Sequence, residues 1–195
     1  MNFLAHCVLG SEDPDLIVGG FLGDFVKGPV PDDMPTGVAR GIRLHRRIDA
    51  YSNTQPDIRI SVGRFPDALR RVAPVFVDVL ADHFLARDFE RFHHEPLEAF
   101  CTKTYAALDR HADWLPDSAL RFRRMVEDTD LFTRYRELAV VERGIRRLAA
   151  RLRVTTRAAS AIETVHGDYE QLRNDFARFF PDLQRHAAEW VDAAR

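Results

Sequence analysis

The sequence predicts an all-α fold in which residues 1–195 form a single compact helical domain. Apolar residues recur at helical spacing along most of the chain. No segment alternates clearly between apolar and polar residues, and no Asn-Gly pair indicates a β-hairpin. The chain has 195 residues, 46% of them hydrophobic, which is enough to bury one core. No apolar run reaches the roughly 18 residues of a membrane span, and the N-terminal stretch lacks the basic region of a signal peptide.

Capping and breaking residues divide the chain into helices. Asn2 can cap the first of them, Pro14 stands near the start of the second, and Gly28 closes it. Residues 29–37 contain three prolines and are predicted to form a loop. Pro181 is expected to break the last helix. The predicted helices cover residues 3–9, 11–28, 36–52, 55–64, 66–88, 96–111, 116–128, 131–152 and 156–194.

Charge and cysteine content restrict the class of protein. The net charge of −2 gives no general affinity for nucleic acid. Only Cys7 and Cys101 are present, which is too few for a disulfide framework and indicates a reducing, cytoplasmic location. Lys27 and Lys103 are the only lysines, so part of the arginine content can reflect coding bias. We therefore interpret arginines only where they cluster near other informative residues.

Several acidic and histidine side chains continue the apolar stripes of the predicted helices. Asp24 continues the stripe of the helix at 11–28, and both His45 and Asp49 continue that of the helix at 36–52. His83 lies on the stripe of the helix at 66–88, with Asp82 at its edge, and the first helix repeats the pattern. The side chains expected to face the interior are His6, Asp24, His45, Asp49, Asp82 and His83.

A carboxylate that faces a core is costly unless it is paired or holds a metal. Mixed histidine and carboxylate ligands suit Mn²⁺, Fe²⁺ or Mg²⁺ better than a thiolate site would. Taken singly, each of these residues has a structural explanation, as a hydrogen-bonded core histidine or as an aspartate at a helix end or in an ion pair. Because six of them lie on four helices, the pattern favours one shared metal site.

Long blocks of the sequence resemble the acyl carrier protein phosphodiesterase family. The blocks run in order through the first half as "MNFLAH", "GDFVKG", "GIRLHRRIDAYSN" and "RRVAPVFVDVLADHFLARDF", and continue more faintly as "LFTRYREL" and "FARFFPDL". The resemblance implies an all-α, distorted relative of the HD-domain phosphohydrolases. It also implies an enzyme, dependent on a divalent metal and usually manganese, that removes 4′-phosphopantetheine from holo acyl carrier protein and leaves the apo protein.

The resemblance assigns roles to the inward-facing residues. It implies that His6 contacts the metal or the phosphate, and that Asp24 is a metal ligand. In "LHRRID", His45 and Asp49 form an acid/base or ligand pair. In "ADHF", Asp82 and His83 are the strongest metal candidates, although HD enzymes carry the reverse order, His-Asp, so that the ligand assignment stays open. We expect Asp24, Asp82 and His83 to hold the metal, with His45 or Asp49 in proton transfer.

Arginines supply two further expectations. Arg46 or Arg47 can clamp a phosphate oxygen with its planar guanidinium, although both also suit a solvated helix face. Acyl carrier proteins are acidic, so a basic patch is expected to steer the partner. Residues 143–157 contain six arginines and no acid, and a second group lies nearer the site, but coding bias explains these arginines equally well. The candidate partner-binding residues are Arg64, Arg70, Arg71, Arg143, Arg146 and Arg147.

Two alternatives remain open at this point. An HD-type phosphohydrolase acting on a nucleotide would share the metal site, and a non-catalytic helical module would bind an acidic protein without a metal.

The pantetheine arm needs a partly apolar groove, which Phe21, Phe25 or Phe84 could line, unless these are ordinary core residues. The sequence makes no prediction about the oligomeric state.

Overall fold

The computed structural model describes residues 1–10 and 12–193, and within these ranges it contains helices and no strand. This confirms the predicted all-α fold. Four short 3₁₀ turns, η1 to η4, lie at 67–69, 89–91, 112–114 and 155–157. The α-helices are α1 (Phe3–Leu9), α2 (Pro14–Leu22), α3 (Thr36–Ser52), α4 (Pro56–Arg64), α5 (Ala73–Arg87), α6 (Leu97–Arg110), α7 (Asp117–Asp128), α8 (Leu131–Arg134), α9 (Leu138–Arg151), α10 (Ala158–Gly167) and α11 (Tyr169–Ala193).

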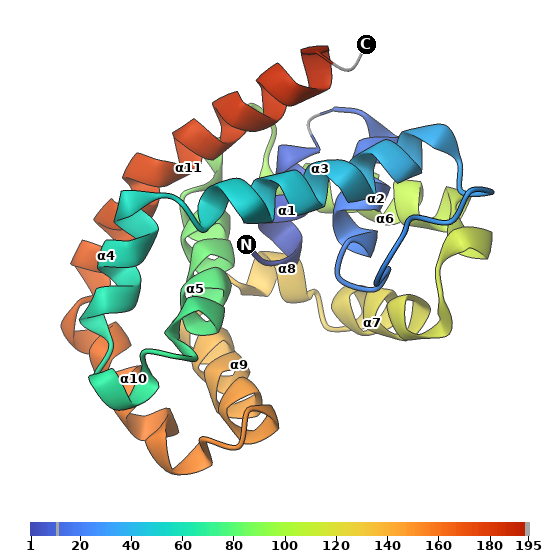
Figure 1. The fold of residues 1–195 in the computed structure, drawn as a ribbon. Coiled ribbons are helices and arrows are strands. Elements are labelled where there is room, and N and C mark those ends of the chain that lie inside the picture. The colour runs from blue at the N-terminus through green and yellow to red at the C-terminus, as the bar shows by residue number, and fades with distance from the viewer. Residues whose placement is uncertain (11, 194–195) are drawn as a thin grey trace.

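The helices pack around one continuous hydrophobic core. Helix α5 is central and packs against α1, α4, α9 and α11, while α2 packs against α1, α3 and α6. Figure 1 shows α3 crossing over α1 and α2, and α11 running along the outer side past α4. Phe21 and Phe84 are fully buried in this core. Their burial agrees with the interpretation of these two residues as ordinary core aromatics. No helix in the described residues is long and apolar enough to cross a membrane.

Glycines let α1, α2 and α3 approach more closely than side chains would allow. A Cβ atom on Gly19 would lie 2.4 Å from the Cα of Gly41, so the two helices cross backbone to backbone. A Cβ on Gly20 would lie 2.6 Å from the carbonyl oxygen of His6. Gly19 and Gly20 therefore permit close helix packing, and this packing brings residues of α1 beside residues of α3.

Several predicted helix boundaries were wrong. The second helix ends at Leu22 instead of Gly28, which places Asp24 in the turn beyond it. The predicted helices at 66–88 and 131–152 are each interrupted, at 70–72 and 135–137. The break in the C-terminal stretch falls between α10 and α11, whereas Pro181 lies inside α11. Pro181 is exposed, so water can hydrogen-bond the carbonyl that its missing N–H leaves free.

Candidate active site

Two histidines and one carboxylate meet where α1 lies against α3. His6 Nε2 lies 3.1 Å from Asp49 Oδ1, and His45 Nε2 lies 3.3 Å from Asp49 Oδ2. The two imidazole rings stack with their centroids 3.6 Å apart. One ligand atom from each of the three residues lies within 4.8 Å of the other two. The structure thus brings together three of the six side chains that the sequence predicted to share a site.

The orientation of His45 is fixed by its backbone partner. Its Nδ1 lies 2.9 Å from the carbonyl oxygen of Gly20, and a carbonyl only accepts, so Nδ1 carries the proton. Nε2 then faces Asp49 either as a donor or as a lone pair that needs a cation. A Cβ atom on Gly23 would lie 2.1 Å from the His45 ring, so glycine at this position makes the space that the ring occupies.

The charges around the cluster shift its proton equilibria. Burial lowers the pKa of His6 to about 3, so the ring is neutral near pH 7. Burial alone would raise the pKa of Asp49, but hydrogen bonds from His45 and His6 outweigh it and hold that pKa well below its usual range. The Met1 amine lies 3.2 Å from both Asp49 and Asp78. Despite burial, these two carboxylates raise the pKa of the amine to about 10, and Asp49 is therefore held as an anion.

A surface hollow of about 330 Å³ opens in front of His45 and Asp49. Asp24 lines it and has no hydrogen bond or ion pair with any other described residue. Arg46 lines it too, and donates a hydrogen bond of 3.0 Å to the carbonyl of Val26, which anchors the guanidinium to the turn after α2. The remaining lining residues are Gly23, Val26, Lys27 and Gly28. The hollow therefore combines one free carboxylate with two cationic side chains.

Asp82 and His83 lie elsewhere. The two carboxylate oxygens of Asp82 accept hydrogen bonds from the backbone N–H groups of Leu4 and Ala5, at 3.1 and 2.9 Å, and so cap α1. His83 Nδ1 lies 2.6 Å from the carbonyl of Tyr135, and its Nε2 lies 2.6 Å from the hydroxyl of Tyr169. Neither side chain joins the cluster of His6, His45 and Asp49, and the assignment of both as metal ligands stays a prediction that their positions do not support.

The arginines predicted to bind phosphate or the partner protein also lie in different places in the structure. Arg47 is exposed, does not line the hollow, and donates to His186 Nε2 at 3.3 Å. Arg64 makes two hydrogen bonds to Asp175, whose side chain is 1% exposed, so it serves an internal ion pair. Arg70 pairs with a neighbouring carboxylate at the surface. The exposed candidates that remain are Arg71, Arg143, Arg146 and Arg147.

Sequence reasoning missed Asp78, Lys27 and the Met1 amine. Asp78 precedes Asp82 by one helical turn, so the same stripe argument could have identified it. A backbone amine has no signature in a residue pattern, and no sequence signal would have placed it beside Asp49.

Comparisons with known proteins agree on one family. The sequence model described as acyl carrier protein phosphodiesterase matches residues 1–183. A protein of that name from Serratia proteamaculans (strain 568) is 31% identical over 192 residues, which cover 97% of this chain and 98% of the relative. Another from Enterobacter sp. (strain 638) is 33% identical over 187 residues, covering 94% and 95%. No solved structure matches, so the predicted likeness to the HD fold stays a prediction.

Proposed function

This chain belongs to the acyl carrier protein phosphodiesterase family, a family of phosphoric diester hydrolases, and we propose that it hydrolyses the bond between 4′-phosphopantetheine and holo acyl carrier protein. The products are apo acyl carrier protein, with a free serine, and 4′-phosphopantetheine. The observation that carries the proposal is the cluster of His6, His45 and Asp49 beside a hollow lined by Asp24, Lys27 and Arg46, in a chain that matches the family over nearly its whole length.

The residues of this cluster fit a divalent cation. Nδ1 of His6 is buried without a hydrogen-bond partner, and Nε2 of His45 faces a carboxylate oxygen. Two imidazoles and one carboxylate suit Mn²⁺, and also Fe²⁺ or Mg²⁺. We propose that His6, His45 and Asp49 hold it, a different set from the one predicted from the sequence. Such an ion supplies charge withdrawal from the phosphate oxygens and a water of lowered pKa.

The side chains of the hollow have roles that follow from their positions. Arg46 is anchored to the Val26 carbonyl by one NH₂ group, so its other donors can bind a nonbridging phosphate oxygen. Lys27 adds a second positive charge at the same hollow. Asp24 has an unpaired carboxylate there, and it is placed to accept the proton of the attacking water. His45 is held by Gly20 and orients Asp49, so it is a positioning residue as well as a metal ligand.

The exposed arginines of α9 are proposed to bind the acidic partner. Helix α9 packs against α5, and Asp78 of α5 lies 3.2 Å from the Met1 amine of the site. Arg143 and Arg147 are exposed on this helix, and no described residue forms an ion pair with either. A basic helix near the cluster would steer an acidic protein toward the hollow.

Cys7 and Cys101 are buried and unpaired, which supports a reducing, cytoplasmic location.

Mass spectrometry of the protein substrate tests the proposed reaction. Purified enzyme with manganese should convert holo acyl carrier protein to the apo mass and release 4′-phosphopantetheine. His45→Ala and Asp24→Asn should lose activity, and His45→Ala should also lose bound metal. His166→Ala, an exposed histidine far from α3 in sequence, is the matched control. An unchanged holo mass together with nucleotide cleavage would support the nucleotide phosphohydrolase, and neither activity would support a binding module.

Charge reversal tests the docking face separately. Arg143→Glu with Arg147→Glu should raise KM for holo acyl carrier protein and leave kcat unchanged, and the effect should shrink at high salt. Arg185→Glu, an exposed arginine on α11, is the control. Equal KM values for both variants would contradict docking on α9 without affecting the proposed reaction.

A further inference from the structure

We propose that Glu12, His93 and His94 form a second site for a divalent transition-metal ion such as Zn²⁺. These residues lie at the other end of α2 from Asp24, in the connection before that helix and in the segment between η2 and α6. One ligand atom from each lies within 4.8 Å of the other two. The site shares no residue with the candidate active site, and the proposal does not depend on the proposed function.

The geometry of the pair formed by His94 and Glu12 suits a metal. His94 Nε2 lies 3.3 Å from Glu12 Oε1. Two ligands about 2.0–2.1 Å from a tetrahedral zinc are separated by about 3.3 Å. The same distance also suits a simple ion pair, so the third ligand, His93, is what distinguishes this cluster. One carboxylate and two imidazoles form a donor set that Zn²⁺, Ni²⁺ and Cu²⁺ accept.

His93 is held in place by its surroundings. Its ring packs between those of Phe89 and Phe100, with centroids 5.1 and 5.0 Å away, and lies 4.8 Å from the ring of His94. A preset ring loses little side-chain entropy on binding. The backbone N–H of Glu95 donates to His93 Nδ1 at 3.2 Å, and this hydrogen bond competes with a metal for the ring. We therefore expect moderate affinity, weaker than that of a closed structural zinc site.

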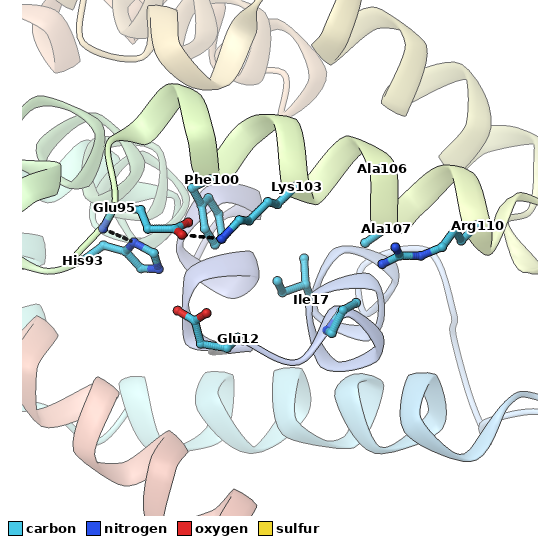
Figure 2. Close-up of a pocket in the computed structure, with 10 residues that line it drawn as sticks. Glu12, Ile17, His93, Glu95, Phe100, Lys103, Ala106, Ala107 and Arg110 are labelled. Carbon is cyan, nitrogen blue, oxygen red and sulfur yellow. Dashed lines mark hydrogen bonds and ion pairs between the residues drawn. The ribbon is translucent and has the colours of Figure 1, made fainter.

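The cluster has room to complete its coordination. Two surface cavities of about 320 and 380 Å³ meet here, and both are lined by Glu12 and His93. Figure 2 shows these two side chains at one end of the first cavity, with Arg110 at the other and Lys103 held by Glu95 along its side. Three protein ligands leave a fourth position for water or an anion. The bound ion would link the segment before α2 to the segment before α6.

A surface ion pair elsewhere in the chain provides a matched control. His166 Nε2 lies 2.8 Å from Glu142 Oε1, and its side chain is 54% exposed, against 67% for His94. No third histidine, cysteine or carboxylate completes that pair within the described residues. If exposed histidine–glutamate pairs bound zinc by themselves, His166 would behave as His94 does.

Histidine footprinting on the full-length protein tests the proposal. Diethyl pyrocarbonate modifies free imidazoles, and trypsin separates the relevant ones, because 92–103 contains His93 and His94 and 158–173 contains His166. Zinc at ten times its Kd should slow modification of the first peptide about tenfold and leave the second unchanged. Equal modification of 92–103 with and without zinc, or equal protection of both peptides, would overturn the proposal.

Zinc titration by calorimetry gives an independent measurement. His45→Ala removes a ligand of the candidate active site and should retain one zinc equivalent. Adding His94→Ala or Glu12→Gln should abolish that remaining binding, whereas adding His166→Ala should not. A stoichiometry that His94→Ala leaves unchanged would contradict the site. The footprint on the unaltered protein decides the question if a variant fails to fold.

Discussion

Replacing Gly23 by alanine should disrupt the candidate active site although it removes no polar group. Gly23 lies in the right-handed helical region, with φ −53°, so alanine meets no backbone strain there. Its Cβ would lie 2.1 Å from Cγ of the His45 ring, however, whereas ordinary contact begins near 3.4 Å. The ring must therefore move by about 1.3 Å, the difference between these two values. That shift would break its 2.9 Å hydrogen bond to Gly20 and withdraw Nε2 from Asp49.

The expected magnitudes follow from two opposing effects. Glycine-to-alanine changes at unstrained positions stabilise a protein by about 0.4–1 kcal/mol through the unfolded state. Overpacking of a close-packed site costs about 1–3 kcal/mol, and we expect this cost to prevail for Gly23→Ala. A misplacement of about 1 Å can reduce a catalytic rate about 10²-fold, so kcat for phosphopantetheine release should fall by about two orders of magnitude.

Urea unfolding and the mass-spectrometric activity assay check both numbers. Gly63→Ala is the matched control, because Gly63 is an exposed helical glycine and a Cβ there meets no atom within 4 Å. The control should be slightly stabilised and fully active. A Gly23→Ala protein that is also stabilised and active would show that His45 has free space around it, and the described packing of the site would then be refuted.

Three further outcomes test other parts of the structure. Arg64→Ala should lower the free energy of unfolding by about 2–3 kcal/mol, because it removes hydrogen bonds to the buried carboxylate of Asp175. Arg70→Ala should change it by less than about 0.5 kcal/mol, and equal values for the two variants in urea titrations would refute this. Asp82→Ala should lower the free energy of unfolding by about 3 kcal/mol, because it leaves the N–H groups of Leu4 and Ala5 without acceptors. The variant should still bind the metal, and a stable variant that has lost the metal would instead identify Asp82 as a ligand. Hydrogen bonds from Arg173 lower the pKa of Asp88 below its unfolded value of about 3.9. The pair therefore stabilises the fold above that value and loses this contribution as pH falls through the folded pKa. The difference in unfolding free energy between wild type and Arg173→Gln should shrink between pH 6 and pH 3, and a constant difference would contradict this.

The helical period explains why part of the site could be predicted. His45 and Asp49 are one turn apart on a single helix, so their shared face follows from the sequence whatever packs against it. His6 was placed inward by the same argument in a helix of only seven residues. Gly19 and Gly20 carry a similar signal, because a glycine inside an apolar helix commonly marks a close packing contact.

The period gives the direction of a side chain but not the group that it meets. Asp82 and His83 face the interior as predicted, yet Asp82 meets the N-terminus of α1 and His83 meets Tyr135 and Tyr169. All three contacts join residues at least 52 positions apart. Arg64 finds Asp175 at a separation of 111 positions, and no local pattern distinguishes it from an exposed arginine.

The amino-acid sequence by itself determined that this protein is helical, which faces of its helices are apolar, and which family it belongs to, because these depend on spacing and on local motifs. Only the tertiary structure decided which inward-facing groups share one site. A buried polar group is costly unless it has a partner, and that partner comes from whichever helix the packing of the whole chain places beside it.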